Sequence, residues 1–240
     1  MGLFEHINAL RKNLFRALIF LVIATALSFL YTTKLIDIMA RPVGGLEALR
    51  AIDVTEPISV YMRVALLVGF ALAFPYIAFE LWLFAAPGLK KKERFFSLMA
   101  IPAATLLFVG GMAFAYFVML PTAIPFLVNF MGIQTELRPS SYVRFVTGVM
   151  FWIGISFEFP LVIYVLASLG VVKGKFLAQQ WRLAVVIIAI LAAAITVTVD
   201  PVNMGLVMAP MIVLYFLSIG LAYIAQGSKK SRVVSPEINN

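Results

Sequence analysis

The stretch that decides the fold covers residues 64–86 and reads VALLVGFALAFPYIAFELWLFAA. Glu80 is its one charged side chain. A helix of roughly 20 apolar residues crosses the hydrocarbon core of a bilayer, because each residue adds about 1.5 Å and the core is about 30 Å thick. The stretch therefore predicts a transmembrane helix.

Comparable apolar runs stand on both sides of it, at residues 14–31, 95–120 and 146–169. A longer run, 183–225, contains Asp200-Pro201, the pattern of a helix N-cap followed by the first helical residue. We divide this run into two short spans, 183–199 and 202–225. The first of these is near the lower length limit, so we expect it to thin the bilayer locally or to lie behind neighbouring helices.

These runs predict an all-α integral membrane protein with about six transmembrane helices. Residues 1–225 are expected to form a single transmembrane domain, and the polar residues 226–240 predict a disordered cytoplasmic tail. Residues 33–40 mix apolar and polar side chains and predict an amphipathic helix on the outer membrane surface. A cleaved signal peptide is the alternative for residues 1–31; its long apolar run and the absence of a small-residue cleavage site argue against it.

The composition supports a membrane protein and excludes several functions. The chain is 63% hydrophobic and 12% charged, whereas soluble domains are about 45–50% apolar and about 25% charged. There is no cysteine and the one histidine is His6, so we expect no disulfide, no metal centre and no cofactor. The spans contain no Ser-His pair and no paired carboxylates, and we therefore expect no enzymatic activity. The net charge of +8 comes from short basic clusters between apolar runs, which argues against nucleic-acid binding.

The basic residues also indicate the orientation of the chain. One side of the predicted membrane carries Arg11, Lys12, Arg16, Lys90, Lys91, Lys92, Arg94, Lys173, Lys175, Arg182, Lys229, Lys230 and Arg232. The other side carries Lys34, Arg41, Arg50, Arg63, Arg138 and Arg144. Because cytoplasmic loops are enriched in Lys and Arg, we place the first set, and with it both termini, in the cytoplasm.

Two acidic residues, Glu80 and Glu158, fall inside predicted spans. An ionised carboxylate at the bilayer centre costs at least about 2.5 kcal/mol, so such residues usually face protein or water, or are protonated. Glu158 has a structural alternative, a hydrogen bond to a backbone group freed by Pro160, and Glu80 can snorkel to the inner headgroups. An ion-coupled solute transporter that uses both acids as proton sites is the alternative function, although the chain has no visible internal repeat.

Two further acids have simple structural explanations. Glu93 stands in the first turn of a predicted helix, after Gly88, where the helix dipole favours an anion. Asp200 fits the role of an N-cap. Helix stability alone is enough to explain both residues, without any part in binding or catalysis.

Several motifs, in order along the chain, resemble those of the TatC family of protein translocase subunits. The longest is FPYIAFELWLFAAPGLKKKER, residues 74–94. Shorter ones are EHINALR at 5–11, TEP at 55–57, GMAFAYFVMLP at 111–121, GISFEFP at 154–160 and Asp200-Pro201. The resemblance extends from about residue 5 to about residue 225.

The resemblance implies a six-helix cup with a concave face and short last helices. It also implies a receptor that binds twin-arginine signal peptides at its cytoplasmic face through Glu93, Phe84, Pro87 and Arg11. Carboxylates suit this task, because a guanidinium donates two parallel hydrogen bonds to one and lysine cannot. On the concave face the resemblance implies a role for Glu158 in docking partners, and we group Glu80 and Asp200 with it.

The implied partners are single-span TatA- and TatB-type subunits and further copies of this chain, and the implied task is the export of folded proteins driven by the proton-motive force. The implied location is the bacterial plasma membrane, in preference to a thylakoid membrane.

The sequence departs from the family pattern at several positions. A second signal-binding glutamate of the family falls on Ala9. Glu5 lies four residues earlier, on the same face of a helix, so either Glu5 substitutes for it or Glu93 binds both arginines. Glu80 stands where the family often has glutamine, which suggests a neutral, hydrogen-bonding carboxyl group. The family's Ser-Gln pair becomes Asn203-Met204, and its prolines before the aspartate become Thr198 and Val199.

Overall fold

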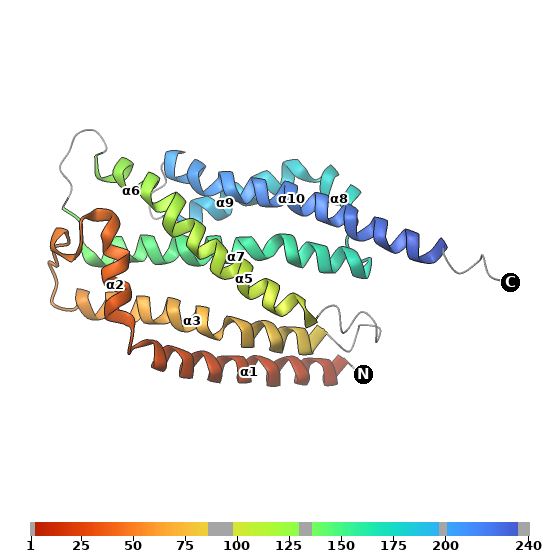
Figure 1. Ribbon diagram of the computed structural model, residues 1–240, viewed down its shortest axis with the longest axis horizontal. Helices are drawn as coiled ribbons and strands as arrows, with labels where there is room; N and C mark the ends of the chain where they lie inside the picture. Colours follow the sequence, from red (N-terminus) through yellow and green to blue (C-terminus); the bar gives the residue numbers. More distant parts are fainter. Residues whose placement is uncertain (1–2, 86–97, 130–135, 197–200, 235–240) are drawn as a thin grey trace. The chain divides into compact units, whose positions relative to one another are not determined.

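The computed structural model describes the backbone of residues 3–85, 98–129, 136–196 and 201–234, and side chains at 8, 10–84, 98–129, 136–196 and 201–226. The regular structure of these residues is helical apart from one isolated β-bridge (Figure 1). The chain forms two compact units, Met1–Trp152 and Ile153–Asn240. Helix α7, Pro139–Leu169, contributes to both units.

The first unit is built on an antiparallel pair, α1 (Leu3–Ser28) and α3 (Glu56–Ala85) (Figure 1). Ser28 Oγ donates a hydrogen bond to the carbonyl of Ala65 at 2.7 Å. One turn further along, Gly69 lies so close to α1 that an added Cβ would stand 2.3 Å from Thr25 Oγ1. Without a side chain at this position, the two backbones approach closely, as is common between transmembrane helices.

Helix α2 (Thr32–Ala40) follows α1 after a sharp bend, which amounts to 75° between segments Leu10–Ser28 and Thr32–Val43. It crosses the end of the α1–α3 pair (Figure 1) and lies where the sequence predicts an amphipathic helix. The last carbonyls of a helix need partners from outside it. Two tyrosines provide them: Tyr116 donates to Ile38 O and Tyr142 donates to Met39 O, both at 2.6 Å.

Short 3₁₀ turns, η1 (Arg41–Val43) and η2 (Leu46–Ala48), complete the connection between α2 and α3. The isolated bridge pairs Leu49 with Leu137, and Arg50 N donates to Leu137 O at 3.1 Å. The connection before α3 and the segment before α7 are therefore joined through their backbones.

A single long helical segment covers residues 100–128 and consists of α5 (Ala100–Phe114), the π-helical turn η4 (Ala115–Met119) and α6 (Leu120–Val128). The predicted span ends at Leu120, but the helix continues beyond it. Pro121 lacks an amide hydrogen and crowds the preceding turn, so a wider π turn before it lets the helix continue. Phe108 of this segment stacks on Phe74 of α3, with ring centroids 4.3 Å apart.

The second unit contains the last part of α7 together with α8 (Gly174–Gln179), α9 (Trp181–Ile195) and α10 (Pro201–Val234). Its core packs Ile163 and Ala167 of α7 against Ala222 and Ala225 of α10. Two hydrogen bonds from α10 hold α8 and the loop before it: Tyr215 OH donates to Leu177 O of α8 at 2.6 Å, and Gln226 Nε2 donates to Val172 O of the loop at 3.1 Å.

Among the described residues, four helices are long and apolar enough to cross a membrane: Glu56–Phe84, Ala100–Val128, Pro139–Leu169 and Pro201–Gln226. The number rises to five if the bent pair 10–28 and 32–43 counts as one span. Helix α9 is shorter, as predicted for the region 183–199.

The end of the chain differs from the prediction. Helix α10 begins at Pro201, where the sequence predicts a new helix, but it continues to Val234. The tail predicted as disordered from residue 226 is therefore helical over its first part, because extending an existing helix costs much less than nucleating one. Asp200 and residues 235–240 lie outside the described residues.

Candidate functional site

The end of the first unit that carries the chain's N-terminus holds a polar cluster between α1 and α3. Asn13 Nδ2 of α1 donates to the backbone carbonyl of Glu80 at 3.3 Å, and Tyr76 OH donates to Glu80 Oε1 at 2.7 Å. The Tyr76 ring stacks on Phe20 of α1, with centroids 4.4 Å apart. These contacts hold the end of α3 against the first half of α1.

Glu80 is 3% exposed. Its Oε1 accepts the tyrosine hydrogen bond, while Oε2 is buried without a hydrogen-bond partner among the described residues. A carboxyl group in this setting lies between two helices of the same chain and does not snorkel to the headgroups. The placement favours the alternative of a hydrogen-bonding group that positions α1 against α3, and it gives no support to partner binding by Glu80.

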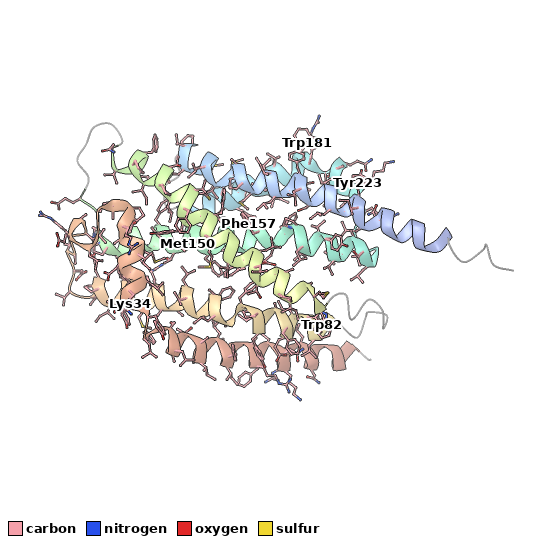
Figure 2. The ribbon with its side chains drawn as sticks, in the orientation of Figure 1. Lys34, Trp82, Met150, Phe157, Trp181 and Tyr223 are labelled. Carbon is pink, nitrogen blue, oxygen red and sulfur yellow. The ribbon has the colours of Figure 1, made fainter. Side chains whose placement is uncertain are left out.

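Aromatic residues occupy the last turns of α3, close to the end of the described segment. Trp82 is half-buried and stacks on Phe79 with centroids 6.0 Å apart (Figure 2). Phe84, a predicted site residue, is half-buried two residues further on. On α1, Arg11 is exposed, and the backbone of Glu5 lies within the helix.

The structure therefore brings part of the predicted signal-binding set to one end of the α1–α3 pair. Arg11 and Phe84 lie there, and so does the backbone at Glu5. Pro87 and Glu93 belong to residues 86–97, which lie outside the described residues.

Of the residues predicted for the concave face, Glu158 is half-buried in the middle of α7, between Phe157 and Phe159. The helix runs through Pro160 without interruption. Glu158 belongs to the second unit and Glu80 to the first, and Asp200 lies outside the described residues.

Sequence reasoning missed Asn13 and Tyr76. The i to i+4 spacing from Tyr76 to Glu80 on a helix is a signal that can reveal that contact. No such signal exists for Asn13, because its contact depends on how α1 and α3 pair.

It also missed the ion pair at the start of α3, where Arg138 Nε donates to Glu56 Oε1 at 2.9 Å and Nη2 donates to the same oxygen. This contact joins the start of α3 to the segment before α7 within the first unit. Its carboxylate, that of Glu56, is buried.

Comparison with known proteins gives one consistent family. A sequence model of the family described as "Sec-independent protein translocase protein (TatC)" matches residues 5–210. A protein of that name from Carboxydothermus hydrogenoformans is 36% identical over 92% of this chain and 93% of its own length. The one from Deinococcus radiodurans is 34% identical over 98% of this chain and 88% of its own length.

The fold agrees with the sequence comparison. A crystal structure titled as the twin-arginine translocase receptor TatC superposes with a TM-score of 0.81 and 30% sequence identity, covering 92% of this chain and 99% of that chain. A second crystal structure, of the same receptor in the detergent DDM, gives a TM-score of 0.82 at 30% identity. The fold class predicted from the sequence, an all-helical protein with several spans, is therefore confirmed, and the resemblance to this family with it. This chain belongs to the TatC family of Sec-independent protein translocase proteins.

Proposed function

We propose that this protein is the translocase subunit that binds twin-arginine signal peptides at the cytoplasmic face of the membrane, with Glu93 as the carboxylate that binds the paired arginines. The crystal structure that is 30% identical to this chain is that of a twin-arginine translocase receptor, TatC, and the motif around Glu93 is the longest stretch of resemblance to the family. A carboxylate accepts two parallel hydrogen bonds from a guanidinium, which explains selection of arginine over lysine.

The observation that carries the proposal is the hydrogen bond from Asn13 to the carbonyl of Glu80. It ties α1, which begins near Glu5, to the end of α3, from which the segment with Glu93 continues. Glu5 lies roughly 12 Å along the helix from Asn13, and Ala85 lies roughly 8 Å from Glu80 in the same direction. The N-terminal segment and the start of the first inner loop therefore emerge at one end.

The direct test measures binding of a fluorescent twin-arginine peptide, and of its twin-lysine version, to the full chain in proteoliposomes. We expect tight binding of the arginine peptide and weak binding of the lysine peptide. Glu93→Lys is expected to abolish binding and to leave membrane insertion intact. Glu47→Lys, which makes the same charge change on an exposed outer turn, is the matched control. Equal binding of both peptides would refute the proposal, and loss of insertion in Glu93→Lys would favour the helix-end role of Glu93.

The role of Glu5 has its own test. If Glu5 substitutes for the missing family glutamate at position 9, we expect Glu5→Ala to weaken binding of the twin-arginine peptide. If Glu5→Ala binds normally while Glu93→Ala does not bind, Glu93 serves both arginines and the substitution hypothesis is wrong.

We further propose that Glu158 lies on a concave face used by single-span TatA- and TatB-type subunits, and that Asp200 contributes to the same face. The same proposal includes the six-helix topology with both termini in the cytoplasm and a location in the bacterial plasma membrane. It also includes assembly with further copies of the chain and export driven by the proton-motive force. A photo-crosslinker at Phe157, next to Glu158, is expected to capture a single-span subunit when the two are co-expressed. A crosslinker at the exposed Phe117 serves as the comparison site, and equal capture at both positions would contradict the assignment.

A further inference from the structure

Two arginines at the outer boundary of the first unit have no carboxylate partner among the described residues. Arg63 lies on α3 and is half-buried, and Arg144 lies on α7 and is exposed. The ion pairs of the described residues use Arg50 and Arg138 instead. The positive-inside bias gives arginines on this side no role in setting the topology, so another reason for their presence is needed.

The register of α3 and α7 places these arginines at the same level. Glu56 of α3 pairs with Arg138 just before α7, and the rings of Phe70 and Phe151 touch in T-shaped geometry, with centroids 5.0 Å apart. These two contacts show that α3 and α7 run parallel and in step over this distance.

Arg63 stands two turns before Phe70, and Arg144 two turns before Phe151. Each lies about 10 Å outward from the ring contact, on the same stripe of its helix. Arg63 shares its stripe with the buried residues Val60 and Leu67 and lies on the side of α3 away from the α1 contacts. Two cationic side chains from neighbouring helices are thus aligned at one depth.

That depth is the level of the lipid headgroups. The stretches without a charged residue begin at Val64 in α3 and at Phe145 in α7, directly after the arginines, and end at Glu80 and Glu158. Arginine stems can lie along the apolar surface while the guanidinium reaches the interface. Leu66, one turn inward of Arg63, is 51% exposed and offers an apolar surface to an acyl chain.

We propose that Arg63 and Arg144 form a binding site for the phosphate group of an outer-leaflet phospholipid, with the lipid chains running inward along α3. A guanidinium group can donate two parallel hydrogen bonds to the oxygens of a phosphodiester, and two such groups more than compensate its single negative charge. The site is at the opposite end of α3 from the signal-binding region. It rests on the membrane orientation given with the proposed function, but not on signal-peptide binding.

The test is native mass spectrometry of the full chain in detergent, titrated with phosphatidylglycerol. We expect the wild-type chain to retain phosphatidylglycerol, and the double variant Arg63→Gln/Arg144→Gln to lower the apparent affinity about tenfold or more through the loss of charge-assisted hydrogen bonds. Lys34→Gln, which removes an exposed cation from α2, is the matched control and is expected to bind as the wild type does. Arg63→Lys/Arg144→Lys keeps both positive charges but removes the planar guanidinium groups, and we expect an intermediate affinity for phosphatidylglycerol.

Two results would overturn the site. Equal lipid retention by the wild type and both double variants, when all elute as folded chains, would show that the arginines do not hold the lipid. Displacement of the lipid by inorganic phosphate at equal concentration would show a phosphate site with no preference for lipid.

Discussion

Gly69 sets the distance between α1 and α3 at the scale of one residue. An added Cβ would lie 2.3 Å from Thr25 Oγ1 and 2.5 Å from Thr25 Cα, and the second of these atoms belongs to the backbone and cannot rotate away. Either the helices separate or the side chains around them are strained. Close packing drives helix association in lipid, where the hydrophobic effect is absent.

We therefore predict that Gly69→Ala lowers the free energy of unfolding by about 1–3 kcal/mol, as overpacking usually does. Gly110→Ala is the matched control, because nothing lies within 4 Å of its added Cβ. It is expected to stabilise the helix by up to about 1 kcal/mol, the difference in helix propensity. Equilibrium unfolding in mixed micelles measures both. Equal effects at the two positions would contradict the packing argument.

At the scale of elements, α1 and α3 are joined at both ends by polar contacts that differ in kind. Ser28 Oγ donates to Ala65 O near the α2 end of the pair, and Asn13 Nδ2 donates to Glu80 O near the end that carries the chain's N-terminus. The Ser28 contact is buried and the Asn13 contact is only partly buried. A partly exposed hydrogen bond opens more easily, so we expect the two helices to separate more easily at the Asn13 end.

Asn13→Ala is expected to weaken binding of the twin-arginine peptide several-fold while leaving the fold intact, because the inner end of α1 loses its side-chain link to α3. Asn129→Ala removes a comparable amide bond, to Pro125 O at 3.0 Å at the exposed end of α6. It should leave peptide affinity unchanged. Fluorescence anisotropy in proteoliposomes compares the two variants, and an equal loss in both would disprove the specific role of Asn13.

Two ion pairs join the start of α3 and the residues before it to the segment before α7, and they offer a second comparison between elements. Glu56 is 6% exposed at its side chain and bonds Arg138, whereas Arg50 and Glu136 are 76% and 73% exposed and lie 3.8 Å apart. Exposed pairs contribute little, since water and ions screen them. A pair with a buried carboxylate leaves that charge uncompensated when its partner is removed.

We predict that Arg138→Gln lowers the midpoint temperature of unfolding clearly more than Arg50→Gln does. Double-mutant cycles with Glu56→Gln and Glu136→Gln measure the coupling within each pair. The coupling should be larger for Glu56–Arg138 and should persist at high salt. If the coupling energy vanishes at high salt for both pairs, the burial of Glu56 does not strengthen its ion pair with Arg138.

At the scale of the whole molecule, the distribution of Lys and Arg predicts that both termini face the cytoplasm. The chain contains no cysteine, so single cysteines can report on each side. In whole cells, Lys34→Cys on α2 is expected to react with a membrane-impermeant maleimide, and Lys173→Cys, also exposed, only after permeabilisation. Labelling of Lys173→Cys from outside would reverse the orientation and remove the basis for a cytoplasmic signal-binding site.

The sequence alone determined the fold class and the family of this protein. Long apolar runs leave a helix as the one structure that satisfies its own backbone in lipid, and ordered motifs such as residues 74–94 point to TatC. Helix ends were less predictable: the segment of α5 to α6 passes through Pro121 because a π turn accommodates it, and α10 extends to Val234.

Tertiary structure alone decided the partners of individual side chains. Asn13 and Glu80 are far apart in sequence, and so are Glu56 and Arg138, yet each pair meets because two helices pack in one register. That register follows from small features such as the missing side chain of Gly69, which no local pattern reveals. The packing of α1 against α3 places Glu80, which the sequence groups with the concave-face residues, in a buried position between these two helices. The register of α3 and α7 aligns Arg63 with Arg144.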